Sequence, residues 1–383
     1  MIFSLRRIIS LCRAFWLFGM LIIFSPFASS AGENLPKTNA DTIAHGSGHT
    51  EIPESKFDAG DMIIEHIVDA HEWHIATIGR THISIPLPVI LFSDGGLHIF
   101  SSSRFHHGEE SYGGFKLETK GKNKGKIVKV IADGITPDET AALPLDFSIS
   151  KNVMSLFISV ALLMFIFISI SRSYTRRKDH APKGMQSLIE PIIMFIRDDI
   201  ARPSIGEKRY MRYMPFLLTL FFFIFLNNLL GLVPFFPGGA NLTGNIAVTM
   251  VLALFTFIIT SFSGNKAYWT HIINAPGVPW WLKFPVPLMP IVEIVGVITK
   301  PFVLMVRLFA NMTAGHIIVL GFMSLIFIFG KMNVGIGLSV TPVSVGFSVF
   351  MGLLELLVAF IQAYVFTLLS AIYFGMATEE HAH

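Results

Sequence analysis

"PFVLMVRLFANMTAGHIIVLGFMSLIFIFG", residues 301–330, is a long apolar run. It contains two ionisable side chains, Arg307 and His316, and the amide side chain of Asn311. Charged groups near the middle of a membrane helix are expensive, so they usually face a cavity or a protein partner. The apolar sequence begins earlier, and a helix over 286–330 would be more than about 60 Å long, twice the hydrocarbon thickness of a bilayer. This segment therefore predicts a long membrane helix that tilts or bends.

The composition is typical of a membrane protein with a polar front part. Of the 383 residues, 52% are hydrophobic and 14% are charged, and the mean hydropathy is +0.61. Soluble domains carry about 25% charged residues. The apolar excess falls almost wholly after residue 150, which predicts a soluble segment followed by a polytopic membrane domain.

Charge and cysteine content exclude some classes of partner and site. The net charge of +3 is small and the basic residues flank apolar runs, which indicates membrane orientation and no nucleic-acid binding. Cys12 is the single cysteine of the chain, so the sequence has neither a disulfide framework nor a zinc-finger spacing.

The second part of the chain, 146–380, is predicted to be an all-α polytopic membrane domain of about five helices, two of them long and tilted. Basic residues after the first apolar segment mark the cytoplasmic side, and the carboxyl terminus is expected on that side too. The stretch "GMQSLIEPIIMFIRDDIARP" (184–203), apolar on one side and charged on the other, is expected at the inner interface. The predicted spans are 153–171, 213–236, 244–263, 286–330 and 343–376.

The first part of the chain is expected to lie outside the membrane. Residues 1–31 have early arginines, a short apolar core and small residues at the end, which predicts a secretory signal peptide; an uncleaved anchor helix is the alternative. Residues 32–145 carry short strand-like runs between turn signals, which predicts a periplasmic extension that is partly β and partly disordered.

"HEWH" (71–74) lacks the zincin spacing, and its histidines are expected to face solvent in a loop. "GKNKGK" (121–126) departs from a phosphate-binding loop at its first glycine and at the residue after its lysine, so no ATP binding is expected.

The ionisable residues of the last two apolar segments are of two chemical types. His316 and Glu355 can both titrate near neutral pH when their surroundings shift them, so together they can pass protons. Arg307 is effectively never deprotonated and acts only as a fixed positive charge. The alternative for Arg307 is snorkelling, in which its side chain reaches the headgroups beyond Lys300. The two types together predict a proton path interrupted by an electrostatic gate.

Helical spacing groups the other polar residues around these three. Glu293, fourteen residues before Arg307, and Asn311, one turn after it, fall near the face of Arg307, whereas His316 turns to roughly the opposite face. Gln362 lies seven residues, two helical turns, after Glu355 and on the same helix face.

Three stretches together resemble subunit a of the F-type ATP synthase membrane sector. They are "FLNNLLGLVPF", "PIVEIVGVITKPFVLMVRLFANMTAGH" and "LLELLVAFIQAYVFTLLSAIYFGMATEEH". The resemblance covers about residues 146–380, and the Arg-Leu-Phe-x-Asn-Met-x-Ala-Gly element that begins at Arg307 is highly specific. It implies a stator with two offset aqueous half-channels that deliver protons to and from a rotating ring of c subunits. It also implies a multi-pass protein of the bacterial inner membrane, with the c-ring and the b subunits of the peripheral stalk as partners and with no cofactor.

By position, the resemblance implies roles for the residues around the arginine. Arg307 resembles the arginine that faces the ring carboxylate and prevents protons from passing directly between the half-channels. Asn311 and Gln362 match the polar neighbours of that arginine. Glu293 matches a carboxylate on the cytoplasmic-side path.

The resemblance also implies an outer half-channel. His316 and Glu355 match an acid and an imidazole of this channel. Many bacterial members have Glu at the position of His316 and His at the position of Glu355, whereas mitochondrial relatives have the arrangement found here. Asn241, in "PGGANLTGN", lies where many members carry Asp or another polar residue of this channel. The extension before residue 146 is longer than the amino-terminal segment of many bacterial relatives, and its role does not follow from the resemblance.

Two other classes compete with a proton-translocating stator. A secondary solute or ion transporter would need broken helices in two matching halves, and the sequence shows no such duplication. An intramembrane metalloprotease would need a ligand set such as HExxH, which the sequence lacks. The expectation is thus a non-nucleotide-binding membrane subunit that is no enzyme by itself, with a secondary transporter as the alternative.

Overall fold

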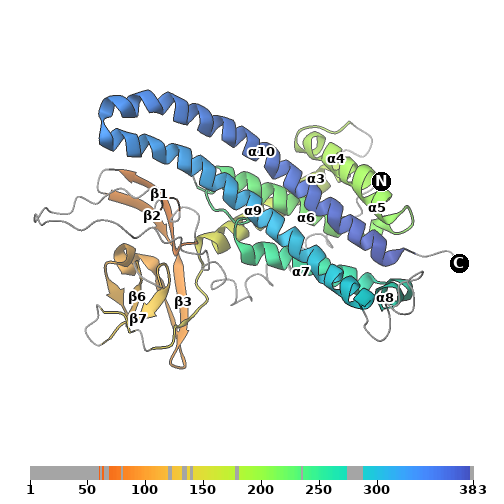
Figure 1. The fold of residues 1–383 in the computed structure, drawn as a ribbon, viewed down its shortest axis with the longest axis horizontal. Helices are drawn as coiled ribbons and strands as arrows, with labels where there is room; N and C mark the ends of the chain where they lie inside the picture. Colours follow the sequence, from red (N-terminus) through yellow and green to blue (C-terminus); the bar gives the residue numbers. More distant parts are fainter. Residues whose placement is uncertain are drawn as a thin grey trace, which may run out of the picture.

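A bundle of long helices and a small β-rich part make up the molecule (Figure 1). The predicted signal peptide, residues 1–31, and the beginning of the predicted extension lie outside the described residues. The computed structural model describes residues 60, 63, 69–78, 81–119, 123–131, 136–138, 141–176, 181–233, 236–273 and 288–379.

Five of the described helices are long and apolar enough to cross a membrane, which confirms the prediction of a polytopic membrane protein. These are α3 (Lys151–Arg176), α6 (Tyr210–Leu232), α7 (Ile246–Ser263), α9 (Leu288–Met332) and α10 (Val334–Thr378). Shorter helical elements connect them: α4 (Met185–Phe195), the π-helical turn η3 (Ile196–Ala201), α5 (Arg202–Ile205) and α8 (Lys266–Ile273).

Helices α9 and α10 form an antiparallel hairpin that extends beyond the other helices (Figure 1). Each has 45 residues, about 68 Å, so neither fits a 30 Å hydrocarbon layer unless it is strongly inclined. Only Asn333 separates them, and its side-chain oxygen accepts a 2.8 Å hydrogen bond from the backbone N–H of Gly335 as an N-cap. The predicted start of the last span at residue 343 is wrong, because the glycine-rich and polar residues before it already belong to α10.

The core of the bundle lies where α6 packs against α10. Phe221 and Ile224 of α6 and Phe366 and Phe374 of α10 are fully buried there. The predicted second span, 213–236, is displaced toward the carboxyl end, because α6 begins at Tyr210 and ends at Leu232.

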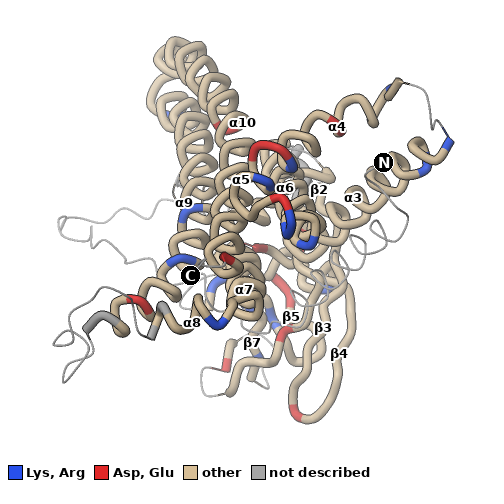
Figure 2. The backbone as a smooth tube through the Cα atoms, turned by 90° about the vertical axis from the view of Figure 1, so that its right-hand side faces the viewer, with Lys and Arg blue, Asp and Glu red and all other residues tan. Residues whose placement is uncertain are grey.

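The segment predicted to lie at the inner interface, 184–203, contributes one face to this core. Its buried residues include Ile193, Ile196 and Ile200. Gly375 of α10 comes so close to the Ser204 carbonyl that a Cβ atom would collide with it. Figure 2 shows Lys and Arg around α5 and at the far end of α3, away from the strands.

The strands form small antiparallel sheets within residues 72–146. Strands β1 and β2 pair as a hairpin, β3 pairs with both β4 and β8, and β6 pairs with both β5 and β7. Val89, Leu91, Phe105, Phe115 and Ile127 form a small apolar core. The strands are β1 (Glu72–Ile78), β2 (Thr81–Pro86), β3 (Pro88–Ser93), β4 (Gly96–Ser101), β5 (Ser111–Tyr112), β6 (Phe115–Leu117), β7 (Ile127–Lys129) and β8 (Leu145–Asp146).

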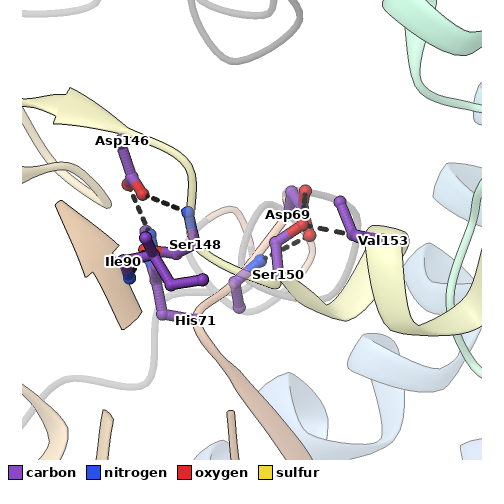
Figure 3. Close-up of polar contacts among 8 residues, drawn as sticks. Asp69, His71, Ile90, Asp146, Ser148, Ser150 and Val153 are labelled. Carbon is purple, nitrogen blue, oxygen red and sulfur yellow. Dashed lines mark hydrogen bonds and ion pairs between the residues drawn. The ribbon is translucent and has the colours of Figure 1, made fainter. Parts of the chain in front are cut away.

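A group of hydrogen bonds joins this β-rich part to the beginning of α3 (Figure 3). Asp69 accepts a 2.6 Å hydrogen bond from the Ser150 hydroxyl and a 3.0 Å bond from the backbone N–H of Asn152. His71 Nε2 lies 2.8 Å from a carboxylate oxygen of Asp146. The expectation that the "HEWH" histidines face solvent in a loop is wrong for His71, whose side chain is 12% exposed and ion-paired. It also misses that residues 72–78 form a strand.

The His71–Asp146 pair makes the stability of this junction depend on pH. Burial works to lower the pKa of His71, but the hydrogen bond and the charge of Asp146 outweigh it and raise that pKa. Burial works to raise the pKa of Asp146, but His71 outweighs it and lowers that pKa. The contribution of His71 to the free energy of unfolding is therefore complete below about pH 6.5 and is lost as pH rises through its raised pKa. The contribution of Asp146 is complete above about pH 4 and is lost as pH falls through its lowered pKa. The pair stabilises most between these limits.

Replacing Asp146 by Asn should therefore destabilise the β-rich part at pH 5.5 by about 1–3 kcal/mol and by less at pH 8.5. The measurement is the midpoint temperature of protease resistance of this part in the full chain in membrane vesicles, at both pH values. Asp94→Asn is the matched control, because Asp94 pairs with Lys129 at 2.8 Å on the exposed surface. Equal effects of the two substitutions at both pH values would contradict the assignment.

Candidate functional site

The centre of the candidate site is a contact between α9 and α10. His316 Nδ1 lies 2.7 Å from Oε1 of Glu355, whose side chain is 6% exposed. The same nitrogen lies 3.0 Å from the carbonyl oxygen of Met312, and Nε2 lies 3.3 Å from that of Gly231 on α6. Both carbonyls can only accept hydrogen bonds, so a ring with hydrogens on both nitrogens satisfies them. The structure thus brings an imidazole and a carboxylate into direct contact inside an apolar helix pair.

The geometry of this contact suits proton exchange. His316 Nδ1 lies within hydrogen-bond distance of two acceptors, the Met312 carbonyl oxygen at 3.0 Å and Oε1 of Glu355 at 2.7 Å. A small rotation of the imidazole would direct the hydrogen at the carboxylate. The two groups are therefore placed to pass a proton without a large movement.

Gly315 makes room for this pair, and sequence reasoning missed it. A Cβ atom at this position would lie 2.8 Å from Oε1 and 3.0 Å from Cδ of Glu355. Its place as the last residue of the Arg-Leu-Phe-x-Asn-Met-x-Ala-Gly element, directly before His316, was the available signal.

The resemblance to subunit a implies that this pair passes protons, and on that expectation Gly315→Ala should lower proton translocation on the order of tenfold, because its methyl group pushes the carboxylate away from His316. Gly321→Ala is the matched control on the same helix, since a Cβ atom there meets nothing within 4 Å. ATP-driven acidification of membrane vesicles measures both. Equal rates for the two variants would show that the close approach of Glu355 to α9 does not matter.

Arg307 and Asn311 lie on a different face of α9 from His316. Asn311 donates a 2.9 Å hydrogen bond to Oε1 of Gln362, which is 2% exposed. Arg307 is exposed and, among the described residues, forms no hydrogen bond or ion pair; its charge acts on Tyr373 of α10. The arginine is therefore presented to the surroundings of the hairpin and not to the buried histidine.

Asn241 lies in the loop after α6, close to the buried pair but not in contact with it. It is 5% exposed, its side-chain oxygen accepts a 2.9 Å hydrogen bond from the N–H of Gly244, and its Nδ2 has no partner among the described residues. The Gly244 carbonyl accepts a 3.4 Å hydrogen bond from Thr313 of α9. A Cβ atom on Gly231 would touch both the Ala240 carbonyl and the His316 ring.

Two further buried polar residues belong to this region, and the sequence analysis gave them no role. Thr243 donates a 2.7 Å hydrogen bond to the side-chain oxygen of Asn228, which donates a 3.2 Å hydrogen bond to the carbonyl of Ala359. Ala359 lies one turn after Glu355 on α10. The adjacent asparagines 227 and 228 in an apolar helix were the available signal, since buried amides need partners.

Glu293 lies at the other end of α9. It is 23 residues before His316, about 35 Å along the helix. Burial, and then the charge of Glu293, raises the pKa of the Tyr268 phenol on α8. Beside it is a cavity of about 20 Å³, room for one water, with polar lining from Thr256, Thr260, Tyr268, Lys300 and Tyr373.

Comparisons with known proteins show to which family the chain belongs. A family model described as ATP synthase A chain matches residues 153–375. The chain belongs to the ATP synthase A chain family. This confirms the resemblance to subunit a that the Arg307 stretch indicated. A second model, described as a domain of unknown function (DUF8433), matches residues 62–147.

Similar proteins carry the corresponding name. "ATP synthase subunit a" of Chloroherpeton thalassium is 45% identical over 62% of this chain and 69% of its own length. "ATP synthase subunit a 2" of Prosthecochloris aestuarii is 36% identical over 93% of this chain and 89% of its own length. "ATP synthase subunit a" of Myxococcus xanthus is 43% identical over 62% of this chain and 78% of its own length.

Membership of the ATP synthase A chain family makes this a membrane subunit of the ATP synthase complex that is not itself catalytic. The P. aestuarii protein matches across both the helical and the β-rich parts, because its alignment covers 361 residues.

Proposed function

We propose that this chain forms two proton half-channels that lead to and from a rotating c-ring. The observation that carries the proposal is the separation of the two ionisable groups on α9: His316 is paired with Glu355 inside the protein, and Arg307 is exposed on another face. A proton carrier and a fixed charge on opposite sides of one helix are what a path with a gate requires. The test is ATP-driven acidification of membrane vesicles with Arg307→Ala, and acidification at an unchanged rate would refute the proposal.

The exposed face of α9 suits a partner helix that carries a carboxylate. Ala310 and Ala314 lie beside Arg307 and Asn311 on this face and are exposed. Small residues allow another helix to approach closely in a membrane. An arginine that is exposed in such surroundings, without an ion pair of its own among the described residues, favours a partner that supplies the negative charge. In the proposed complex that charge is the ring carboxylate.

The outer half-channel comprises Asn241, His316 and Glu355, with Asn228 and Thr243 as polar neighbours. The buried Nδ2 of Asn241 that has no described partner supports this assignment, because such a group is usually satisfied by water. Protons would enter past Asn241 and reach the ring after exchange between the histidine and the glutamate.

The cytoplasmic half-channel passes Glu293 and the small cavity next to Tyr268. This cavity lies at the end of the bundle where α5 packs against α10 and where Arg209 donates a hydrogen bond to the Thr378 carbonyl. The basic residues near this end favour the cytoplasmic side. They include Arg172, Arg176, Lys183, Arg202, Lys208 and Arg212.

The membrane orientation follows from the same asymmetry. The β-rich part is joined to the start of α3, and Arg172 and Arg176 lie at the opposite end of that helix. We therefore place residues 32–145 in the periplasm, behind a signal peptide at 1–31, and the carboxyl terminus in the cytoplasm of a bacterium. The b subunits of the peripheral stalk are proposed as further partners.

The alternative of a secondary transporter is less well supported. Solute sites at the middle of such proteins are built from discontinuous helices. Helices α9 and α10, which carry Arg307, His316 and Glu355, each continue without interruption over 45 residues.

A further inference from the structure

Four of the five side chains in residues 69–73 contact four different parts of the protein. Asp69 accepts hydrogen bonds from Ser150 and from the backbone N–H of Asn152 at the start of α3. His71 pairs with Asp146 at the end of β8 (Figure 3). Glu72 Oε2 lies 2.8 Å from His107 Nδ1, in the turn that follows β4, and it accepts a 3.2 Å hydrogen bond from Ser84 of β2. Such a set of polar contacts holds the backbone of this segment against both the sheets and the first membrane helix.

The fourth side chain of the segment contacts the membrane domain at another place. Trp73 is 3% exposed, and its ring meets that of Phe236 edge to face, with centroids 5.2 Å apart. Phe236 is 44% exposed and lies in the loop between α6 and α7 that carries Asn241. A fixed, buried tryptophan thus holds an aromatic side chain on the loop at the outer end of the bundle.

The loop is directly connected to the polar centre of the candidate site. Gly239 donates a 3.1 Å hydrogen bond to the carbonyl of Leu230, and Ala240 is buried against Gly231. Gly231 in turn accepts from His316. A displacement of the loop at its start is therefore transmitted to Asn241 and to the surroundings of the histidine.

We propose that the β-rich part serves as a scaffold for the mouth of the outer half-channel, with Trp73 as the positioning residue that holds the loop through Phe236. This inference rests on the proposed function. In this proposal residues 62–147, which match the model of a domain of unknown function, position the channel mouth for proton entry. Trp73 does not itself carry protons, so its loss should change how well protons enter and not how fast a saturated channel turns over.

The test is ATP synthesis by the assembled complex in vesicles, driven by an imposed proton gradient, over a range of pH values on the outer side. Trp73→Ala should raise the proton concentration for half-maximal rate by about twofold to tenfold, the range that aromatic pairs of this geometry contribute. The maximal rate per assembled complex should stay the same, and Trp73→Phe should restore most of the loss. Phe92→Ala, at an exposed aromatic residue of β3, is the matched control and should leave the half-maximal concentration unchanged.

A second variant keeps the test decisive if Trp73→Ala prevents assembly. Phe236→Ala removes the other side of the contact, at a half-exposed position outside the β-rich part, and should give the same shift. The double variant should be no worse than either single one, because the two side chains act through one contact. A half-maximal concentration that is unchanged in Phe236→Ala, or a double variant whose shift is the product of the two single shifts, would overturn the inference.

The outcome separates this inference from the proposed function. If Arg307→Ala abolishes proton translocation but the Phe236 and Trp73 variants behave like the control, only the scaffold role fails. If Arg307→Ala leaves translocation intact, the proposed function fails, whatever the Trp73 variant does.

Discussion

Arg307→Ala is expected to abolish ATP-driven proton pumping, with a loss on the order of a hundredfold or more. The guanidinium is a fixed charge that cannot give up its proton, and it lies on an apolar helix surface without an ion pair among the described residues. In the proposed complex it stabilises the deprotonated ring carboxylate in a low-dielectric interface. Without it, the carboxylate stays protonated and the ring no longer exchanges protons with both half-channels in turn.

The same substitution should also make the membrane leak. Removal of the fixed charge removes the barrier between the two half-channels, so a preformed proton gradient should collapse faster in Arg307→Ala vesicles. Arg307→Lys keeps a positive charge but loses the planar, permanently protonated group, so it should block leakage better than it supports pumping. Arg172→Ala, at an exposed arginine near the end of α3, should pump normally. Full pumping by either Arg307 variant would falsify the gate.

The exchange of His316 and Glu355 is the second large effect. Each single substitution, His316→Glu or Glu355→His, places two like groups where a nitrogen and an oxygen are 2.7 Å apart. Two carboxylates or two imidazoles at this distance cannot both be charged, so each single variant should lose pumping by about tenfold to a hundredfold. The double variant restores one acid and one imidazole, and it should pump faster than either single variant.

The recovery should be partial, for a reason that the structure supplies. The carbonyl oxygens of Met312 and Gly231 point at the His316 ring and would face a carboxylate in the double variant. Acceptors that face each other without a hydrogen are unfavourable. The initial rate of vesicle acidification, normalised to assembled complex, measures the order of the variants. A double variant no faster than the faster single one would contradict a functional pair.

Much of the membrane architecture could be predicted from hydropathy alone. A bilayer requires long apolar helices, and hydropathy finds them. For four of the five predicted spans, most of the predicted first and last residues lie within about four residues of the ends of the observed helix. The start of the last helix was predicted nine residues too late, because Gly335, Gly337 and Pro342 are residue types that are typical of turns. The sharp reversal at Asn333 depends on a helix cap, and only the packing of α9 on α10 makes so short a connection stable.

The residues of the candidate site were predicted from the sequence, and the exchanged acid and imidazole of the resemblance indicated that His316 and Glu355 form a close pair, which the structure shows. Helical spacing correctly separated Arg307 from His316, since a rotation of about 100° per residue needs no tertiary information. It could not show that His316 meets Glu355, because these residues lie on two helices whose relative register is set by packing. The glycine that admits the carboxylate, Gly315, became evident only from the position of the neighbouring helix.

The amino-acid sequence by itself determined that this chain is a membrane subunit of the ATP synthase, because a local motif and the length of an apolar segment depend only on residues near one another in the chain. Only the tertiary structure showed the direct contact of His316 with Glu355 and the exposed position of Arg307, because both depend on how distant segments pack. It alone also brought Trp73 of the β-rich part against Phe236 of the membrane domain. Contacts between residues 163 positions apart cannot follow from periodicity, since periodicity describes one element at a time.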